Sequence, residues 1–243
     1  MNKIILIGPL FSPITGLSVA NNQALKTFSS FQKPAYINTS PRQFSESLGK
    51  LNLLSLLHFS RSYLKIYKIF TADKVYYTPG QTFLGVLKYA PFILLSKFLG
   101  KELIVHIHGN YLSQQYSQLK GFKKRVFHYL LAISSKGIVL SEGLLHNLTP
   151  FLSSENIFVL PNFYDEFLTE QPLNKTHNKL HICYLSNLME EKGIFFLLDA
   201  LSELNAKGIS FEASIAGHID QSQRDKILSR VKQIKGVTYK GIV

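Results

Sequence analysis

The sequence predicts an α/β protein with a doubly wound parallel sheet, and three patterns support this prediction. Short apolar runs alternate with helical patterns in which apolar residues recur at three- and four-residue steps. The runs are apolar throughout, which is typical of strands buried on both faces of a parallel sheet. A polar stretch then interrupts the alternation. We therefore expect an N-terminal Rossmann-like domain at 1–163, a linker at 164–178 and a partial second Rossmann-like domain at 179–243.

Six strands and five helices are predicted in the first domain. Ser18 is a suitable N-cap for the first helix, Pro79-Gly80 ends the third strand, and Pro91 predicts a kink in the third helix. The predicted strands span 3–8, 35–38, 74–78, 102–108, 137–141 and 157–161. The predicted helices span 18–30, 50–70, 85–99, 114–134 and 142–151.

Two of these helices have faces that the periodicity defines. The helix at 50–70 carries a basic stripe of Arg61, Lys65 and Lys68. Its expected apolar side consists of Leu53, Leu56, Leu57 and Leu64. The expected apolar face of the helix at 114–134 consists of Phe122, Val126, Tyr129 and Ile133. Its first half carries a basic cluster of Lys120, Lys123, Lys124 and Arg125.

The second domain begins with a predicted strand, a polar loop and a helix. The strand spans 181–187, the helix spans 193–206, and Lys192 lies at the start of that helix. A helix N-terminus presents unpaired N–H groups and partial positive charge, so a lysine there suits a phosphate. The alternative is a solvated lysine beside a core unit. The pattern continues with a strand at 211–216, a helix at 220–233 and a strand at 237–243.

The distribution of charge narrows the classes of partner. Residues 1–162 carry 17 Lys and Arg against 5 Asp and Glu, a net charge of +12, whereas residues 163–243 carry 10 of each. Such asymmetry indicates a polyanionic surface met by the first domain, either nucleic acid or anionic lipid. No helix-turn-helix, RRM, KH or OB signature is present, so we expect no nucleic-acid partner. Basic amphipathic helices fit an anionic membrane surface, although they also occur as ordinary solvated faces.

The remaining composition favours a cytoplasmic protein. The single cysteine, Cys183, excludes a disulfide framework and is consistent with a reducing compartment. The first residues form a predicted strand rather than a signal peptide, and no run reaches the ~18 apolar residues of a spanning helix. We expect a cytoplasmic chain that can associate peripherally with the inner face of the cytoplasmic membrane.

Two glycines and two histidines are candidates for a ligand site. Gly8 and Gly16 are too far apart for the G-x-G-x-x-G pattern, so an NAD site is not expected, although Gly16 can let backbone N–H groups approach a ligand. His106 and His108 share a strand face, but a third metal ligand at suitable spacing is missing, so no metal is expected. We expect His106 to be a hydrogen-bonded core residue. His108 ends the strand, where open α/β sheets bind ligands.

These segments resemble the GT-B glycosyltransferases of family 4, a retaining, nucleotide-sugar-dependent family, in the order in which the family has them. The loop after the first strand and the strand that ends in His108 match the N-terminal domain. The match over nearly all 243 residues rests on GPLFSPITGLS, IVHIHG, IVLSEGL, LPNFYD, YLSNLMEEKGIFFLLDAL and FEASIAG.

The resemblance implies two Rossmann-like domains, with acceptor bound mainly by the first and nucleotide by the second. It implies that His108 contacts the donor sugar and supports the transition state. It places Gly16 near the donor phosphates, and Lys192 on the diphosphate as the nucleotide departs. The implied activity is a retaining glycosyltransferase of hexosyltransferase type without a cofactor. It would move a sugar to a glycan or lipid-linked acceptor in bacterial lipopolysaccharide, capsule or exopolysaccharide synthesis.

The sequence departs from the family in two ways. Asn187 stands where the family usually has an arginine in the phosphate site, so an amide replaces a charge there. The paired glutamates spaced E-x7-E lie beyond the segment that ends at Val243, so the resemblance is C-terminally incomplete. The alternative function is therefore a truncated, non-catalytic remnant or a partner subunit of such an enzyme.

Overall fold

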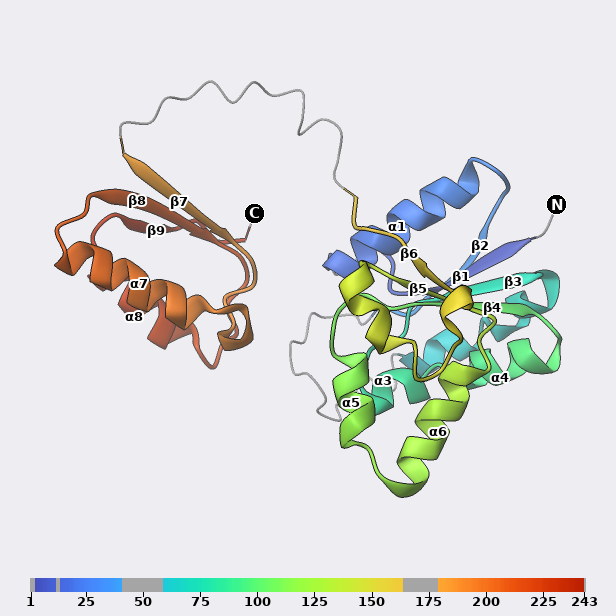
Figure 1. Cartoon of the computed structure of the whole chain (residues 1–243). Helices are drawn as coiled ribbons and strands as arrows, with labels where there is room; N and C mark the ends of the chain where they lie inside the picture. Colours follow the sequence, from blue (N-terminus) through green and yellow to red (C-terminus); the bar gives the residue numbers. More distant parts are fainter. Residues whose placement is uncertain (1–2, 12–13, 41–58, 164–178, 243) are drawn as a thin grey trace. The chain divides into compact units, whose positions relative to one another are not determined.

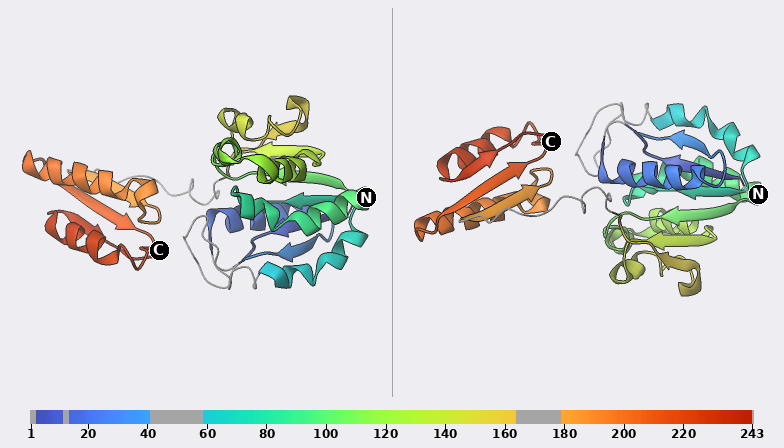
Figure 2. Two further views of the ribbon diagram at one scale, coloured as in Figure 1. Left: turned by 90° about the horizontal axis from the view of Figure 1, so that it is seen from below. Right: turned by 90° about the horizontal axis from the view of Figure 1, so that it is seen from above.

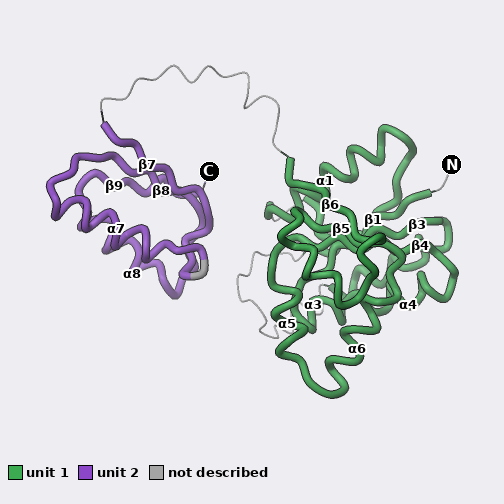
Figure 3. The backbone as a smooth tube through the Cα atoms, in the orientation of Figure 1, with its two compact units in different colours: residues 1–165 green, residues 166–243 purple. Residues whose placement is uncertain are grey.

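The computed structural model describes residues 3–11, 14–40, 59–163 and 179–242, which fall in two compact units. The first unit spans residues 1–165 and the second spans residues 166–243 (Figure 3). The predicted linker at 164–178 lies outside the described residues, as do Leu53, Leu56 and Leu57 of the predicted helix at 50–70.

The first unit is built on one parallel sheet of six strands (Figure 1). The strands are β1 (Ile4–Gly8), β2 (Ala35–Asn38), β3 (Lys74–Tyr77), β4 (Glu102–His106), β5 (Lys136–Val139) and β6 (Ile157–Val159). Their order is β2-β1-β3-β4-β5-β6, and every neighbouring pair is parallel. The predicted α/β fold with a parallel sheet is confirmed, and the carboxyl ends of all six strands lie at one edge.

Helices cover both faces of this sheet (Figures 1 and 2). The helix α1 (Gly16–Ser29) packs on one face, through Ala24, Leu25 and Phe28 against Leu6 and Tyr76. The other face carries the larger core. It is covered by α3 (Phe83–Leu87), α4 (Ala90–Phe98), α5 (Leu112–Gln118) and α6 (Gly121–Ala132). Residues 59–63 are also helical, and a turn at 64–65 separates them from η1 (Ile66–Thr71), so the helix predicted at 50–70 does not run unbroken to residue 70. Two further 3-10 helices are η2 (Glu142–Asn147) and η3 (Ser154–Asn156).

The second unit is a three-stranded parallel sheet with both of its helices on one face (Figure 1). Its strands are β7 (Leu180–Leu185), β8 (Phe211–Ala216) and β9 (Val237–Tyr239), in that order. Its helices are α7 (Ile194–Ala206) and α8 (Arg224–Gln233), and the turn η5 (Glu190–Lys192) precedes α7. A separate core forms from Ile194, Leu198, Leu201, Ile215, Ile227 and Val231.

Two predicted helices are each broken into two. The helix expected at 85–99 is α3 followed by α4, because Pro91 cannot continue a helix but is well placed in the first turn of a new one. The helix expected at 114–134 is α5 followed by α6. The chain turns at Gly121, whose φ of 54° is a left-handed conformation that glycine adopts readily.

The predicted apolar face of α6 is half right, because Val126 and Ile133 are partly buried against the core but Phe122 and Tyr129 are not. In α6 the buried residues are Phe127, Leu130 and Leu131, whereas Phe122 and Tyr129 are 79% and 55% exposed. Leu64, expected on an apolar side, is 78% exposed and lies in a turn before η1.

Three smaller predictions also change. The N-cap of α1 is Thr15 rather than Ser18, and the two residues form a reciprocal capping box. The strand β4 ends at His106, two residues earlier than predicted. Lys68 differs from the exposed Arg61 and Lys65 of the predicted stripe, because it is half-buried and its Nζ donates a hydrogen bond to the Tyr36 carbonyl at 3.2 Å. None of the described helices is long and apolar enough to cross a membrane.

The face of α6 that is buried makes a testable difference to stability. We expect Phe127→Ala to lower the free energy of unfolding of the first unit by about 3–5 kcal/mol, because Phe127 is fully buried between the sheet and α5. Tyr129→Ala on the same helix should change it by less than about 0.5 kcal/mol. Urea unfolding followed by circular dichroism measures both. Equal losses would contradict the observed phase of the helix.

Candidate functional site

His106 and His108 lie side by side at the carboxyl edge of the first sheet. His106 is the last residue of β4, and His108 follows it in the loop. The intervening Ile107 is fully buried in the core on the opposite face. The two imidazole rings therefore lie on the same side, with their centroids 3.9 Å apart. The prediction that they share a face is confirmed, although His108 lies beyond the strand.

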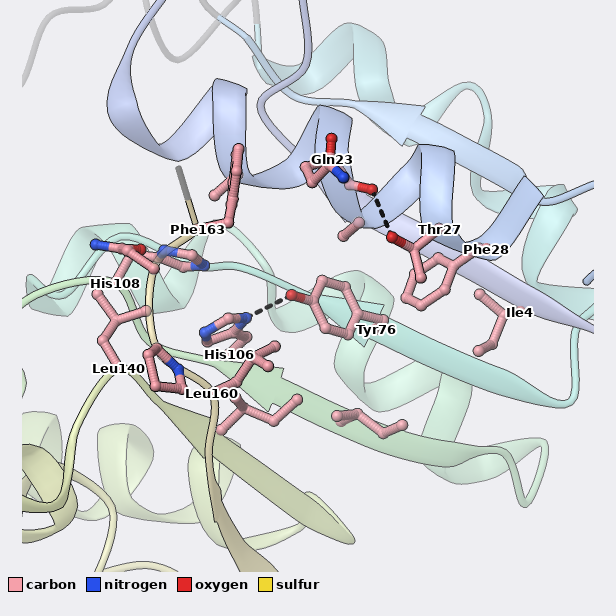
Figure 4. Close-up of a pocket in the computed structure, with 16 residues that line it drawn as sticks. Ile4, Gln23, Thr27, Phe28, Tyr76, His106, His108, Leu140, Leu160 and Phe163 are labelled. Atoms are coloured by element: carbon pink, nitrogen blue, oxygen red, sulfur yellow. Dashed lines mark hydrogen bonds between the residues drawn. The ribbon is translucent and has the colours of Figure 1, made fainter. Parts of the chain in front are cut away.

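Both histidines line an apolar pocket of about 430 Å3 on the face covered by α1 (Figure 4). Its walls include Ala24 and Phe28 of α1, Ile104 of β4, Ile138 of β5 and Leu160 after β6. A pocket with such walls excludes water from much of its surface. The few polar groups in it therefore determine what it can hydrogen-bond.

His106 is held by the neighbouring strand. It is 4% exposed, and its Nδ1 lies 2.5 Å from the Tyr76 hydroxyl of β3. Burial raises the pKa of Tyr76, so the phenol keeps its proton. A buried phenol needs an acceptor for that proton, and Nδ1 is within reach. Tyr76 then donates to Nδ1, and the imidazole proton lies on Nε2. The expected core hydrogen bond is present, but Nε2 has no partner among the described residues.

Both imidazoles are neutral at pH 7. Burial, together with a smaller effect of the neighbouring His108, lowers the pKa of His106 to about 3. Burial lowers the pKa of His108 to about 4. The Nε2 of His108 is also buried without a partner in the described part of the chain. His108 can therefore exchange a hydrogen bond with a hydroxyl, but it brings no positive charge to a phosphate.

Gln81 fixes the backbone of the loop that carries His108. Its Nε2 donates to the His108 carbonyl at 2.8 Å. Its Oε1 accepts from the backbone N–H groups of Tyr111 at 2.6 Å and Leu112 at 3.1 Å. Gly109 lies between these contacts with a φ of 131°, and a Cβ there would lie 2.3 Å from Gln81 Nε2. The approach of the glutamine therefore requires a glycine.

A buried asparagine holds the first turn of α5, which follows this loop. Asn147 is fully buried, and its Oδ1 accepts from the backbone N–H of Ser113 at 3.0 Å. Its Nδ2 donates to the Leu144 carbonyl at 3.2 Å. The loop after β4 is thus hydrogen-bonded to the segments after β3 and after β5, which is the arrangement of a pre-organised site.

Gly16 is the first residue of α1, at the same edge of the sheet as His108. No atom of the described residues would lie within 4 Å of a Cβ at this position. The close approach in this loop occurs instead at Gly8, where a Cβ would lie 2.3 Å from Thr78 Oγ1. There the buried Asn21 of α1 donates from Nδ2 to the Pro9 carbonyl and to Thr78 Oγ1, both at 2.9 Å. The structure therefore leaves room at Gly16 beside a helix N-terminus.

Asn187 and Lys192 lie in the loop that joins β7 to α7 in the second unit. Lys192 is exposed at the end of η5, one residue before Gly193, which has a φ of 79°. The Tyr184 hydroxyl donates to the Lys192 carbonyl at 3.1 Å. Half-buried Asn187 lies where the loop closely approaches Gly217, at which a Cβ would lie 1.9 Å from the Ser186 carbonyl oxygen.

The structure brings some of the predicted site residues together and adds others. Gly16 and His108 share one edge of one sheet, whereas Asn187 and Lys192 belong to the other unit. Sequence reasoning missed Gln81, Tyr76 and Asn147. Gln81 directly follows Pro79-Gly80, which ends the third predicted strand. Its position after the end of a strand is the feature of the sequence that could have identified it as a site residue. In the described residues, no three His, Cys, Asp or Glu side chains form a group suited to a metal ion.

The low pKa of His106 predicts acid sensitivity. The folded pKa lies below the unfolded value of about 6.5, so the unfolded chain binds a proton that the native state excludes. Its contribution to stability is complete above about pH 6.5 and is lost as the pH falls toward 3. Between pH 6.5 and 5.5, wild type should lose about 1 kcal/mol more than His106→Gln. Urea unfolding at both pH values measures this, and equal losses would contradict it.

Gln81 should contribute measurably to the stability of the loop. Gln81→Leu keeps the size of the side chain but leaves two backbone N–H groups and one carbonyl without their partner. We expect it to cost about 1–3 kcal/mol of unfolding free energy. Gln114→Leu, an exposed change on α5, is the matched control and should stay within about 0.5 kcal/mol. Equal thermal shifts of the two variants would argue against the role of Gln81.

Comparison with known proteins identifies the fold. No protein-family model and no curated protein sequence matches the chain. Among solved structures, the apo form of the lipopolysaccharide outer core galactosyltransferase WaaB is similar over 99% of this chain and 68% of that one, at 15% identity and a TM-score of 0.59. TarM is similar over 74% of this chain and 36% of that one, at 15% identity and a TM-score of 0.54.

A second TarM structure points to the same fold. It is a variant from S. aureus in complex with fondaparinux, alpha-GlcNAc-glycerol and UDP. It matches 74% of this chain and 36% of its own, at 17% identity and a TM-score of 0.51. At these identities the likeness shows the fold alone. The chain has the α/β fold of the GT-B glycosyltransferases, with Rossmann-like units.

Proposed function

We propose that the chain is a glycosyltransferase polypeptide that transfers a sugar from a nucleotide-sugar donor to a glycan or lipid-linked acceptor in bacterial surface polysaccharide synthesis. The observation that carries the proposal is His108. It lies at the carboxyl edge of the sheet, with a lowered pKa and a buried Nε2 that has no partner in the described part of the chain. A neutral imidazole in an apolar wall is suited to hydrogen-bond an uncharged sugar hydroxyl.

Two further observations support the class of substrate. WaaB is a galactosyltransferase of the lipopolysaccharide outer core, and one TarM structure holds UDP together with alpha-GlcNAc-glycerol. Lys192 lies two residues before α7, close enough to its N-terminus for its charge and the helix dipole to act in the same direction on a phosphate. These features fit a nucleoside diphosphate as the leaving group.

In the proposed reaction, the acceptor hydroxyl attacks the anomeric carbon while the bond to the diphosphate oxygen breaks, and the hydroxyl proton passes to that departing oxygen. Negative charge then grows on the departing diphosphate, and Lys192 stabilises it. The amide of Asn187 and the backbone at Gly16 supply hydrogen bonds without charge. His108 hydrogen-bonds the sugar in the transition state. By analogy with the family that the sequence resembles, the configuration at the anomeric carbon is retained and no metal takes part.

The test separates binding from transfer. We expect Lys192→Ala to weaken the binding of a nucleotide sugar such as UDP-galactose or UDP-GlcNAc by about 10–100-fold, because a charged hydrogen bond is lost. Lys232→Ala on α8 is the control and should bind as wild type does. His108→Ala should keep nucleotide affinity within about threefold but slow nucleotide release in the presence of acceptor glycan by about 100-fold or more.

Isothermal titration measures the first quantity and a nucleoside-diphosphate release assay measures the second. If the full chain binds no member of a panel of nucleotide sugars, the proposal is wrong. The alternative of a non-catalytic remnant or partner subunit would then be favoured. If His108→Ala transfers as fast as wild type, the proposed role of that residue is wrong.

A further inference from the structure

We infer that the outer surface formed by α4 and α6 is a docking surface for an anionic lipid bilayer. We define this α4–α6 surface by the exposed apolar residues Leu94, Phe98, Phe122 and Tyr129 together with the basic residues Lys97, Lys123 and Arg125. The inference goes beyond sugar transfer, because it concerns where the first unit binds rather than what it catalyses.

The apolar part of the surface follows one face of each helix. Phe122 and Tyr129 lie seven residues apart on α6, and Leu94 and Phe98 lie four apart on α4, so each pair points the same way. Phe98 is 86% exposed and Phe122 is 79% exposed. Exposed apolar residues of this size, on helices that border one groove, mark an interaction surface.

The two helices border one shared groove at this surface. An open groove of about 430 Å3 is lined by Leu87, Leu94, Val126 and Tyr129, so α4 and α6 border the same groove. Figure 1 shows the two helices on the same side of the sheet, facing away from α1. Arg125 also lines the groove, which places a cation directly among the apolar side chains.

The charge on this side has one sign. The helices α3, α4, α5 and α6 contain no Asp or Glu. Within the described ranges, the ion pairs of the first unit join Glu102 to Lys74 and Lys136. The three cations of the α4–α6 surface are therefore not neutralised by a described carboxylate, and they are free to meet phosphate groups outside the protein.

A bilayer fits this combination better than the alternatives. Phenylalanine and leucine side chains enter the boundary between headgroups and acyl chains, while lysine and arginine remain at the lipid phosphates. A nucleic acid would use the cations but would leave the apolar strip in water. A second copy would bring cations against cations, with no acidic residue on these helices to offset them.

Flotation of the full chain with vesicles tests the proposal. We expect binding to phosphatidylcholine vesicles that contain phosphatidylglycerol, and at least about tenfold weaker binding to vesicles of phosphatidylcholine alone. Raising the salt concentration should weaken the binding but not abolish it, because the apolar part is not screened. Neither donor nor acceptor is present, so the outcome does not depend on the proposed function.

Two matched pairs of variants locate the surface. Phe122→Ala should weaken vesicle binding about tenfold, whereas Phe196→Ala on α7, which is also 79% exposed, should not change it. The double variant Lys123→Gln and Arg125→Gln should weaken it about 25-fold. The control double variant Lys26→Gln and Lys33→Gln removes the same charge at and beyond α1, and should weaken it less than about threefold.

Three results would overturn the inference. The first is no binding to the anionic vesicles at low salt. The second is an equal effect of the two double variants, which would mean that net charge alone attracts the protein. The third is a dimer in size-exclusion chromatography that Phe122→Ala dissolves, without vesicle binding, which would assign the surface to self-association. All these changed side chains are exposed, and circular dichroism verifies that each variant is folded.

Discussion

The parallel pairing of β1, β3 and β4 is the constraint on which the candidate site depends. Parallel strands end at one edge, so the loops after these three strands meet there without being close in sequence. Gln81 then bonds the loop after β3 to the loop after β4, and Asn21 bonds α1 to the end of β3. The sheet supplies the approximate geometry, and buried amide side chains complete it.

Burial on the α1 side of the sheet determines the chemistry of this edge. Apolar walls hold His106 and His108 in the neutral state, and Tyr76 orients the first of them. Neutral imidazoles in an apolar wall suit an uncharged hydroxyl, and they bring no positive charge to an anion.

Most of the fold could be predicted, because buried strands and the Gly and Pro residues that end them are visible as local patterns in the sequence. The strand Ala35–Asn38 and the helix ending at Ala206 were predicted at their observed bounds or within one residue. The face of α6 could not be predicted. Phe122 and Tyr129 repeat with helical spacing, and so do Phe127 and Leu131, so periodicity offers two solutions. Only the packing in the folded unit buries Phe127 and Leu131 fully and leaves Phe122 and Tyr129 exposed.

A site residue could be predicted only where its position along a strand determines where it lies in the fold. His108 could be placed because it ends the strand predicted at 102–108. Gln81 and Asn147 act through backbone groups that are 27 to 34 residues away, and single-sequence patterns carry no information on such pairings. Glycines give a partial exception. Gly109 is required because Gln81 Nε2 occupies the place of its Cβ. The glycine after His108 therefore indicates that another group approaches the backbone closely, although the sequence does not identify that group.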